Sequence, residues 1–360
     1  MRLEKPLAPG STIGILGGGQ LGRMLALAAA QLGLNSHIYA PETDSPAFQV
    51  AMDHTVAGYH DFAALEQFAK SVDVVTYEFE NVPGDTASFL EARCVLAPNS
   101  AALKTAQDRV DEKTFIASLG IPIAPFAAVA NETDLVSALK KIGRPAILKT
   151  RRFGYDGKGQ TKILADTSPA VAWAEIGKAP AILEGFIAFD MEISVIAARG
   201  WDGAVTVYDV PENHHENHIL KSSTVPARIS PEIAAAARVM GRKIISALHY
   251  VGVMGIEIFV SGKNLSVNEI APRVHNSGHW TQDACVVSQF EQHIRAISGW
   301  PLGDTMRHSN VVMHNILGDE AGKWVEFAGK AQTGVHYYGK SETRRGRKMG
   351  HINVLTPRQG

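Results

Sequence analysis

The sequence has little of what marks several common classes of protein. Only two cysteines, Cys94 and Cys285, occur in 360 residues, so we expect neither a disulfide framework nor a cysteine-based zinc site. No apolar run approaches membrane-spanning length and the first residues have no apolar core, so we expect a cytoplasmic protein with no membrane partner. The sequence has 35 Lys and Arg residues and 36 Asp and Glu residues, so its net charge is -1. This charge gives no overall field that attracts nucleic acid.

The composition and the order of elements predict several globular domains. A chain of this length that is 45% hydrophobic is expected to form two or three of them. The first hundred residues alternate apolar strands with helical patterns, which predicts a parallel sheet covered by helices. The prolines of GIPIAPF, at 120–126, then indicate a domain boundary. The elements predicted before it are strands over 12–16, 36–39, 55–57, 72–77 and 95–96 and helices over 21–32, 61–70 and 101–119.

The stretch GILGGGQLGRML, at 14–25, has the glycine spacing of a dinucleotide fingerprint. Gly17, Gly19 and Gly22 satisfy G-x-G-x-x-G between a predicted strand and a predicted helix. The free N–H groups of such a turn attract phosphate, and Glu42 stands about where an acidic ribose ligand is expected. The alternative is that these glycines only allow the helix to pack closely on the sheet. The motif alone does not separate a cofactor site from a packing feature.

Carboxylates also follow a predicted strand in YEFENVP, at 77–83. Open α/β sheets bind ligands at the carboxyl ends of their strands, so Glu78 and Glu80 are candidate site residues. Solvated loop residues are the plainer interpretation of both.

Beyond the boundary, the segment RRFGYDGKGQTKIL, at 151–164, reads as a glycine-rich hairpin. It follows a predicted helix over 132–142 and a predicted strand over 146–150, and it carries Lys158 close to Lys149. A glycine loop between antiparallel strands can fold over a triphosphate, because its N–H groups and lysines offset phosphate charge. A mobile surface turn is the alternative.

Two later segments place one acid each in an otherwise apolar strand. Residues 254–260 and 265–270 predict antiparallel strands joined by a turn, and they carry Glu257 and Glu269. An isolated ionised carboxylate in a buried strand is costly, so two of them facing each other need a cation. Oxygen ligands of this kind suit magnesium. The alternative is a pair of salt bridges, for one of which Arg273 could serve.

Taken together, these segments resemble the ATP-grasp enzymes, in which ATP lies between two antiparallel sheets. GGGQLGRM, YEFENVP, DRVDEK, NEIAPRVHNSGHWT and GRKMGH resemble, within that fold, the 5-(carboxyamino)imidazole ribonucleotide synthase family. The resemblance implies a mixed α/β and α+β protein with a Rossmann-like parallel-sheet domain, a lid domain with a glycine-rich flap and an antiparallel-sheet catalytic domain. The corresponding ranges are 1–105, 106–188 and 189–360.

The resemblance also implies ATP and Mg²⁺ as cofactors and assigns residues to them. Magnesium would be held by Glu257 and Glu269. His215 is preferred to its neighbours His214 and His218, which we expect in an exposed polar loop. The implied ATP-binding residues are Arg109, Lys149, Gly154, Tyr155, Asp156, Gly157, Lys158, Gly159, Gln160, Glu184, Gly185, Phe186, Ile187, Glu192, His215, Asn268 and Glu269.

The reaction that the resemblance implies joins bicarbonate to the amine of aminoimidazole ribonucleotide at the expense of ATP. The implied catalytic residues are Arg273, His275, Asn276 and Asp156. The implied ribonucleotide ligands are Gln20, Glu80, Lys340 and Arg347, with the GGGQLG turn at the 5′-phosphate. Lys340 and Arg347 belong to a basic segment, YGKSETRRGRKMGH, in which the choice among Arg344, Arg345 and Arg347 stays open.

Three other functions share some of these sequence features. A dehydrogenase would use the glycine turn but leaves the flap and the two facing acids unexplained. A nucleotide-sensing binding protein would have little use for those acids. A formate-using glycinamide ribonucleotide transformylase shares the architecture. We expect a homodimer, as is usual in the family, and no nucleic-acid partner, because the basic segment lacks interleaved aromatic residues.

Overall fold

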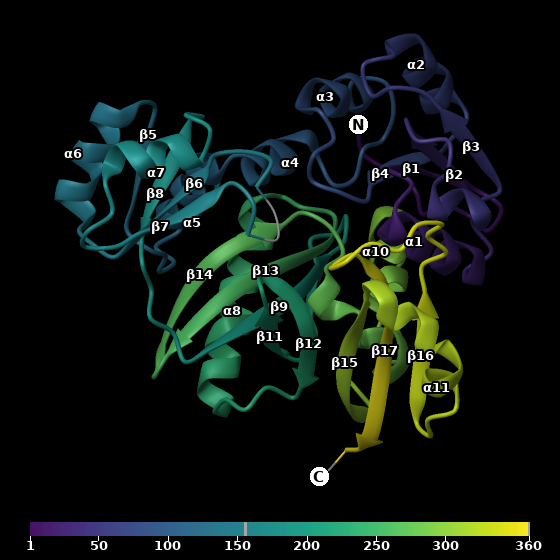
Figure 1. Ribbon diagram of the computed structural model, residues 1–360. Coiled ribbons are helices and arrows are strands. Elements are labelled where there is room, and N and C mark those ends of the chain that lie inside the picture. The colour runs from purple at the N-terminus through teal and green to yellow at the C-terminus, as the bar shows by residue number, and fades with distance from the viewer. Residues whose placement is uncertain (155–156, 359–360) are drawn as a thin grey trace.

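The computed structural model describes residues 1–154 and 157–358, which form three sheets with their covering helices (Figure 1). The first sheet is parallel, as predicted, with the strand order β3-β2-β1-β4. Val95–Leu96 does not form the predicted fifth strand and contributes only an isolated bridge from Leu96 to Val75. The elements of this unit are β1 (Thr12–Leu16), α1 (Gln20–Gln31), β2 (Asn35–Ala40), η1 (Pro46–Gln49), β3 (Asp53–Val56), α2 (Phe62–Lys70), β4 (Val74–Tyr77) and α3 (Gly84–Glu91).

The single helix predicted over 101–119 is wrong, because the chain forms two helices there. They are α4 (Ser100–Gln107) and α5 (Arg109–Ser118), and Asp108 between them has an extended backbone with φ -117° and ψ 115°. Its carboxylate accepts hydrogen bonds from the N–H groups of Val110 and Asp111 at 3.0 and 3.4 Å. Asp108 therefore caps α5, because a carboxylate satisfies the unpaired N–H groups at a helix start.

The second sheet, which we call the lid sheet, is antiparallel with the order β5-β8-β6-β7. β6 and β7 form the predicted glycine-rich hairpin, with Lys149 opposite Gln160. Of the residues predicted to bind ATP in this segment, Tyr155 and Asp156 lie outside the described part of the chain. The elements here are β5 (Phe126–Val129), α6 (Glu132–Ile142), β6 (Ala146–Thr150), β7 (Gln160–Ile163), α7 (Pro169–Glu175) and β8 (Ala181–Gly185).

The third sheet has nine strands and begins at its edge with β14, followed by β13, β9, β11, β12, β15, β17 and β16, while β10 pairs with β9. The segment expected to be a polar loop around His214 instead forms β11. The elements are β9 (Met191–Arg199), β10 (Val205–Val207), β11 (Glu212–Glu216), β12 (Ile219–Val225), α8 (Pro231–Ala247), β13 (Gly252–Ser261), β14 (Asn264–Ala271), η2 (Asn276–Gly278), α9 (Thr281–Ala284), α10 (Gln289–Ile297), β15 (Ser309–Leu317), η3 (Gly318–Lys323), α11 (Trp324–Ala328), β16 (Thr333–Tyr337) and β17 (Lys348–Pro357).

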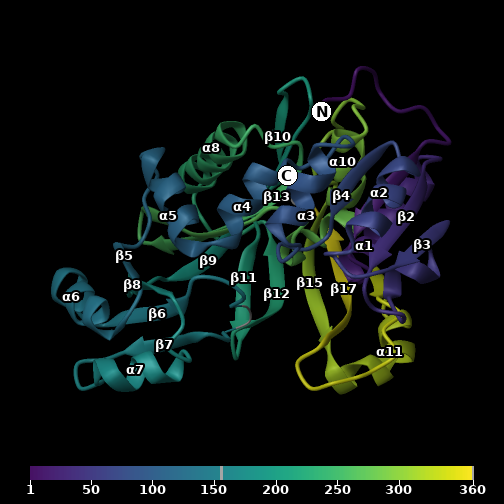
Figure 2. The same ribbon diagram turned by 90° about the horizontal axis from the view of Figure 1, so that it is seen from above.

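The first and third sheets share a hydrophobic core, whereas the lid sheet has its own. Ile13 and Ile15 of β1 belong to the same buried cluster as Val253 of β13 and Phe290 of α10. The lid cluster contains Leu148 and residues of α6, α7 and the lid strands only. Figure 2 shows the lid sheet standing apart on the side of β9, away from the parallel sheet. Within the described part of the chain, no helix is long and apolar enough to cross a membrane.

Candidate active site

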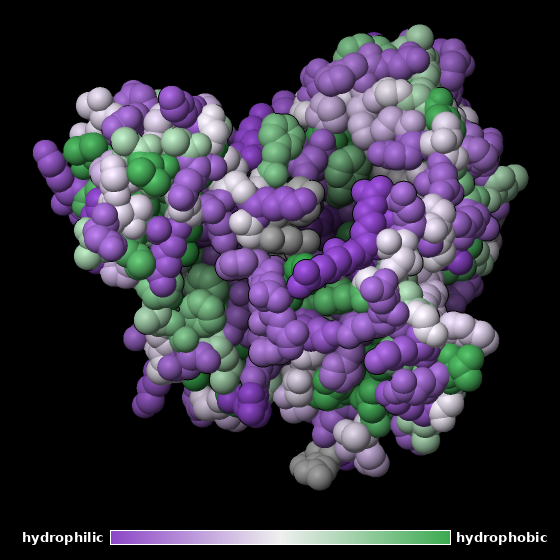
Figure 3. Space-filling view, viewed as in Figure 1, coloured by the Kyte–Doolittle hydropathy of each residue, from purple (hydrophilic) through white to green (hydrophobic). Residues whose placement is uncertain are grey.

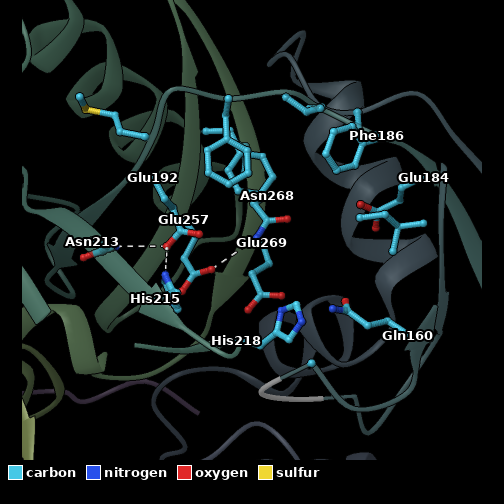
Figure 4. A pocket seen from close by; sticks show the side chains of 18 of the residues that line it. Gln160, Glu184, Phe186, Glu192, Asn213, His215, His218, Glu257, Asn268 and Glu269 are labelled. Atoms are coloured by element: carbon cyan, nitrogen blue, oxygen red, sulfur yellow. Dashed lines mark hydrogen bonds and ion pairs between the residues drawn. The ribbon is translucent and has the colours of Figure 1, made fainter. Parts of the chain in front are cut away.

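A cavity of about 810 Å³, which we call the large cavity, lies between the lid sheet and β9, β11, β13 and β14. Figure 3 shows the molecule hollowed at this level, and Figure 4 shows the lining side chains pointing inward from both sides. Of the predicted ATP-binding residues, those that line it are Arg109, Lys149, Gly157, Lys158, Gln160, Glu184, Gly185, Phe186, Ile187, Glu192, His215, Asn268 and Glu269.

One end of the large cavity is apolar. Phe189 and Phe259 stack there with ring centroids 4.3 Å apart, and Phe186 lies across from them on the lid side. Next to this end, Lys149 Nζ donates to Glu184 Oε2 at 3.0 Å in a buried ion pair. An apolar slot flanked by a few fixed polar groups is the usual form of a small-molecule site.

The other end of the large cavity carries the two predicted acids. Glu257 and Glu269 are directly opposite each other in the β13–β14 register, as the sequence predicted. Arg109 Nη1 donates to Glu269 Oε2 at 2.9 Å. Glu257, within the described part of the chain, receives a long contact of 3.4 Å from the Asn268 amide and lies 3.5 Å from His275 Nε2. Arg273, suggested as a partner for one acid, instead pairs with Glu80.

The two acids differ in their affinity for a proton. Burial raises the pKa of Glu257 well above its usual range, and the nearby carboxylates of Glu192 and Glu269 raise it further. Burial also acts on Glu269, but the Arg109 guanidinium outweighs it and lowers the pKa of Glu269. Glu257 is therefore a buried carboxyl group that lacks a strong cationic partner among the described residues.

Glu192 and His215 face each other beside these acids. His215 Nδ1 lies 3.5 Å from Glu192 Oε1, which also receives a 3.4 Å contact from the Asn213 amide. Burial raises the pKa of Glu192 to about 8. One ligand atom each from Glu192, His215 and Glu257 lies within 4.8 Å of the others, so the oxygen-rich centre extends from β13 to β9 and β11.

A second cavity of about 330 Å³, the small cavity, lies on the side of the parallel sheet. His275 is buried within it, and burial followed by the charge of Arg273 lowers its pKa to about 3, so it is a neutral hydrogen-bonding group. His275 Nδ1 lies 2.8 Å from Ser277 Oγ, which leaves Nε2 directed toward Glu257. The predicted catalytic and substrate residues lining the small cavity are Gln20, Glu80, Arg273, His275 and Asn276.

The two cavities adjoin each other. His215, Glu257 and Glu269 line both of them. A group bound at these acids therefore lies at the meeting point of the large and the small cavity. This arrangement allows a group to pass from a ligand in one cavity to a ligand in the other.

The glycine turn of the parallel sheet already holds an anion that belongs to the protein. The N–H groups of Gly19 and Gly22 donate to the two carboxylate oxygens of buried Glu78, at 2.6 and 2.8 Å. A Cβ at Gly19 would lie 2.4 Å from Glu78 Oε1, so the glycine is needed for this close approach. Glu78 therefore already occupies two of the N–H groups that were expected to hold a ligand phosphate, while the role of the rest of the turn stays a prediction.

Some predicted residues lie elsewhere, and some lining residues were not predicted. Gly154 lines the small cavity, and Gly159 lines neither cavity. Lys340 and Arg347 also line neither cavity. Lys340 donates to the backbone carbonyl of Lys348, and Arg347 donates to that of Glu342. His214 and His218 are exposed, as expected. Lining residues that the sequence reasoning missed include Lys113, Phe189, Phe259, His279 and Lys348. For Lys348, the basic segment itself was the available signal.

Comparison with known proteins agrees with this geometry. Residues 11–107 match the ribonucleotide synthetase preATP-grasp domain, 114–290 the ATP-grasp domain, and 311–360 the phosphoribosylaminoimidazole carboxylase C-terminal domain. The chain is 52% identical over 98% of both chains to the N5-carboxyaminoimidazole ribonucleotide synthase of Brucella melitensis.

Solved structures give the same result. The chain superposes with a TM-score of 0.95 on an ADP complex of an N5-carboxyaminoimidazole ribonucleotide synthetase, at 42% identity, covering 98% of this chain and 94% of that one. It superposes with a TM-score of 0.90 on the Aspergillus clavatus enzyme in complex with ADP and 5-aminoimidazole ribonucleotide, at 30% identity, covering 97% and 94%. The chain belongs to the N5-carboxyaminoimidazole ribonucleotide synthase family of ATP-grasp enzymes.

Proposed function

We propose that this protein uses ATP to carboxylate 5-aminoimidazole ribonucleotide with bicarbonate in purine biosynthesis, giving the N5-carboxyamino ribonucleotide, ADP and phosphate. Family membership supports the reaction. The observation that carries it in this chain is the pair of adjoining cavities with Glu257 and Glu269 between them. ATP in the large cavity and bicarbonate with the ribonucleotide in the small one would meet at those acids.

We assign ATP to the large cavity along its length. The apolar end beside Phe186 and Phe259 suits the adenine ring, and Glu192 with His215 suits the ribose. The phosphates would then reach Arg109, Lys149 and the glycine-rich hairpin. The remaining residues predicted for ATP keep that role as proposals.

The residues at the acids fit a magnesium ion. Glu257 and Glu269 offer carboxylate oxygens and the Asn268 side chain a carbonyl oxygen, and the raised pKa of Glu257 marks a carboxylate that lacks a cation. Magnesium favours one or two carboxylates completed by phosphate oxygens and water. When bound, it would offset the charge of the ATP phosphates during transfer.

The chemistry proceeds in two steps. A bicarbonate oxygen attacks the γ-phosphorus and the bond to ADP breaks, giving carboxyphosphate. The amine nitrogen then attacks the carboxyl carbon of carboxyphosphate, or of carbon dioxide released from it. The bond between that carbon and the phosphate oxygen breaks, and a proton of the amine passes to the released phosphate. We propose that Arg273, His275 and Asn276 hold the bicarbonate and the carboxyphosphate, because they line the small cavity next to Glu257. Asp156 stays a proposed catalytic residue.

The ribonucleotide would lie against the parallel sheet. Gln20 and Glu80 line the small cavity there, and Arg273 already orients Glu80 through their ion pair. Lys340 and Arg347 remain the proposed ligands of the 5′-phosphate, with Arg344 and Arg345 as the alternatives. Since Glu78 occupies the glycine turn, these basic side chains would have to supply most of the phosphate contacts.

Three further proposals accompany the reaction. We divide the chain into domains at 1–105, 106–188 and 189–360. We propose a homodimer, for which exposed apolar residues such as Val286 and Met306 of the last domain offer contact surface. We propose that it works in the cytoplasm.

ADP release tests the function directly. It is measured with ATP and Mg²⁺, with and without aminoimidazole ribonucleotide, in bicarbonate-supplemented and bicarbonate-depleted buffer. We expect strong release only when both substrates are present. Equal release without bicarbonate, or release that requires formate and glycinamide ribonucleotide, would refute the assigned reaction while leaving the fold family intact.

A further inference from the structure

Two neighbouring ionisable residues lie buried beside β14, the strand that carries Glu269. Glu112 and Lys113 of α5 are only 2% and 1% exposed. β14 is the edge strand of the nine-stranded sheet, and α5 packs along it. Buried charged side chains are rare unless something specific compensates them. Their partners therefore indicate what they do.

The two side chains bond the main chain of β14 on either side of Glu269. Glu112 Oε1 accepts a hydrogen bond from the Ile270 N–H at 2.5 Å. Lys113 Nζ donates to the Asn268 carbonyl at 2.6 Å. These two buried side chains thus satisfy two main-chain groups that an edge strand would otherwise leave unpaired. Glu269 lies between these two anchored residues.

The anchored segment contains an irregularity in the strand. Glu257 pairs with Glu269, but the next residue, Ile258, pairs with Val267, so Asn268 is the extra residue of a bulge. A regular strand would turn Asn268 and Glu269 to opposite faces, whereas a bulge can re-aim a side chain. Both residues line the large cavity (Figure 4). The contacts from α5 hold the backbone at the point where this re-aiming occurs.

Lys113 also reaches the lid sheet. Its Nζ lies 3.6 Å from Glu184 Oε2 on β8, the same oxygen that Lys149 contacts at 3.0 Å. The Lys113 side chain therefore links β8 of the lid sheet with β14, the strand that carries Glu269. Lys113, Glu184 and Glu269 all line the large cavity, so this link lies at its wall.

Stability alone does not account for these residues. Burying an ionisable side chain costs free energy, and replacing a buried ion pair by apolar residues of similar size is often neutral or stabilising. Glu112 and Lys113 contact the backbone on either side of Glu269, and Lys113 also contacts Glu184. These contacts are better explained by the backbone geometry that they impose on β14. Mutation of a residue that hydrogen-bonds a metal ligand typically lowers metal affinity or activity about 10–100-fold.

We propose that Glu112 and Lys113 are positioning residues that fix Asn268 and Glu269 in the geometry required by a divalent cation bound with the nucleotide. The proposal rests on the proposed function of Glu257 and Glu269 as metal ligands. It predicts that both residues matter for the part of nucleotide affinity that depends on the metal. A purely structural role predicts a loss of stability without that selective effect.

The test compares ADP binding with excess Mg²⁺ and with EDTA, by isothermal titration calorimetry. The ratio of the two dissociation constants isolates the metal-dependent part. For Lys113→Met and Glu112→Leu we expect this ratio to fall about 10–100-fold. Glu112→Gln keeps a carbonyl oxygen for the Ile270 N–H, so this variant is expected to retain most of the wild-type ratio. Should Lys113→Met fail to fold, Lys113→Gln replaces it, with a loss of at least about threefold expected for one weakened hydrogen bond.

A matched control separates positioning from stability. Arg307→Met breaks the partly buried pair between Arg307 and Asp209, at 2.7 Å. Both residues lie close to the nine-stranded sheet, and neither lines the large or the small cavity. It is expected to lower the unfolding temperature and leave the ratio unchanged. If the wild-type ratio is large and the Glu112 and Lys113 variants match this control, the positioning role is refuted. If the wild-type ratio is close to one, the proposed metal site itself fails.

Discussion

Acid should weaken the junction between the parallel sheet and the nine-stranded sheet through one histidine. His293 of α10 is fully buried, and its Nδ1 accepts a hydrogen bond from the Val253 N–H at 3.0 Å. Because Nδ1 is an acceptor, Nε2 carries the proton and donates to Thr76 Oγ1 at 2.8 Å. The neutral ring therefore bridges β4 and β13, and a protonated ring would lose the bond to Val253.

The size of the effect follows from linkage. Burial lowers the pKa of His293 to about 3, against roughly 6.5 in the unfolded chain. Between these values the unfolded state binds more protons, so stability rises with pH. The contribution is fully present above about pH 6.5 and is lost as the pH falls toward 3. Between pH 7.5 and pH 5 this one residue should remove about 2 kcal/mol.

His293→Asn isolates this contribution, since the asparagine Oδ1 can still accept from Val253 but the side chain does not titrate. Urea unfolding at pH 7.5 and pH 5, followed by circular dichroism, gives the loss of stability for each protein. Other buried histidines titrate equally in both, so the wild type should lose about 2 kcal/mol more than the variant. Equal losses would refute the assignment of a neutral, depressed-pKa ring at this junction.

Three further substitutions test the site. Glu78→Leu leaves the N–H groups of Gly19 and Gly22 without acceptors and should cost about 2–6 kcal/mol in urea unfolding; a cost below about 0.5 kcal/mol would contradict the role given to Glu78. Arg273→Met should lower kcat/KM for the ribonucleotide by at least about 100-fold. Its ADP affinity, measured by calorimetry, should stay unchanged, because Arg273 lines the small cavity and not the large one. An equal loss in ADP affinity argues against two separate cavities. Glu257→Gln should abolish the Mg²⁺ enhancement of ADP binding, and a retained enhancement would move the metal elsewhere.

Local sequence patterns predicted much of the fold and the pair of acids. Alternating polarity placed β13 and β14, and antiparallel pairing of two such strands put Glu257 opposite Glu269. The break at Asp108 was missed because helical periodicity continues across it, and only the capping of α5 by its carboxylate ends the first helix. Periodicity reports which face of a segment is buried, not where a side chain interrupts the backbone.

Contacts between distant segments were beyond this reasoning. Glu112 and Lys113 look like ordinary surface charges of a helix until α5 is placed against β14, more than 150 residues later in the chain. Phe259 reads as one apolar residue of a strand, yet its stacking on Phe189 forms a wall of the large cavity. Such roles depend on tertiary placement, which no local spacing encodes.

The glycine turn shows why a motif needs its surroundings before it indicates a ligand. The N–H groups at the start of α1 have the geometry that attracts an anion in dinucleotide-binding proteins. Here the chain supplies that anion from β4, one strand away, because Glu78 follows Tyr77 at the carboxyl end of the sheet. A pyrophosphate would have to displace a buried carboxylate and leave it without its two donors. The same turn therefore fixes the end of β4, and with it the loop that carries Glu80 to Arg273 at the small cavity.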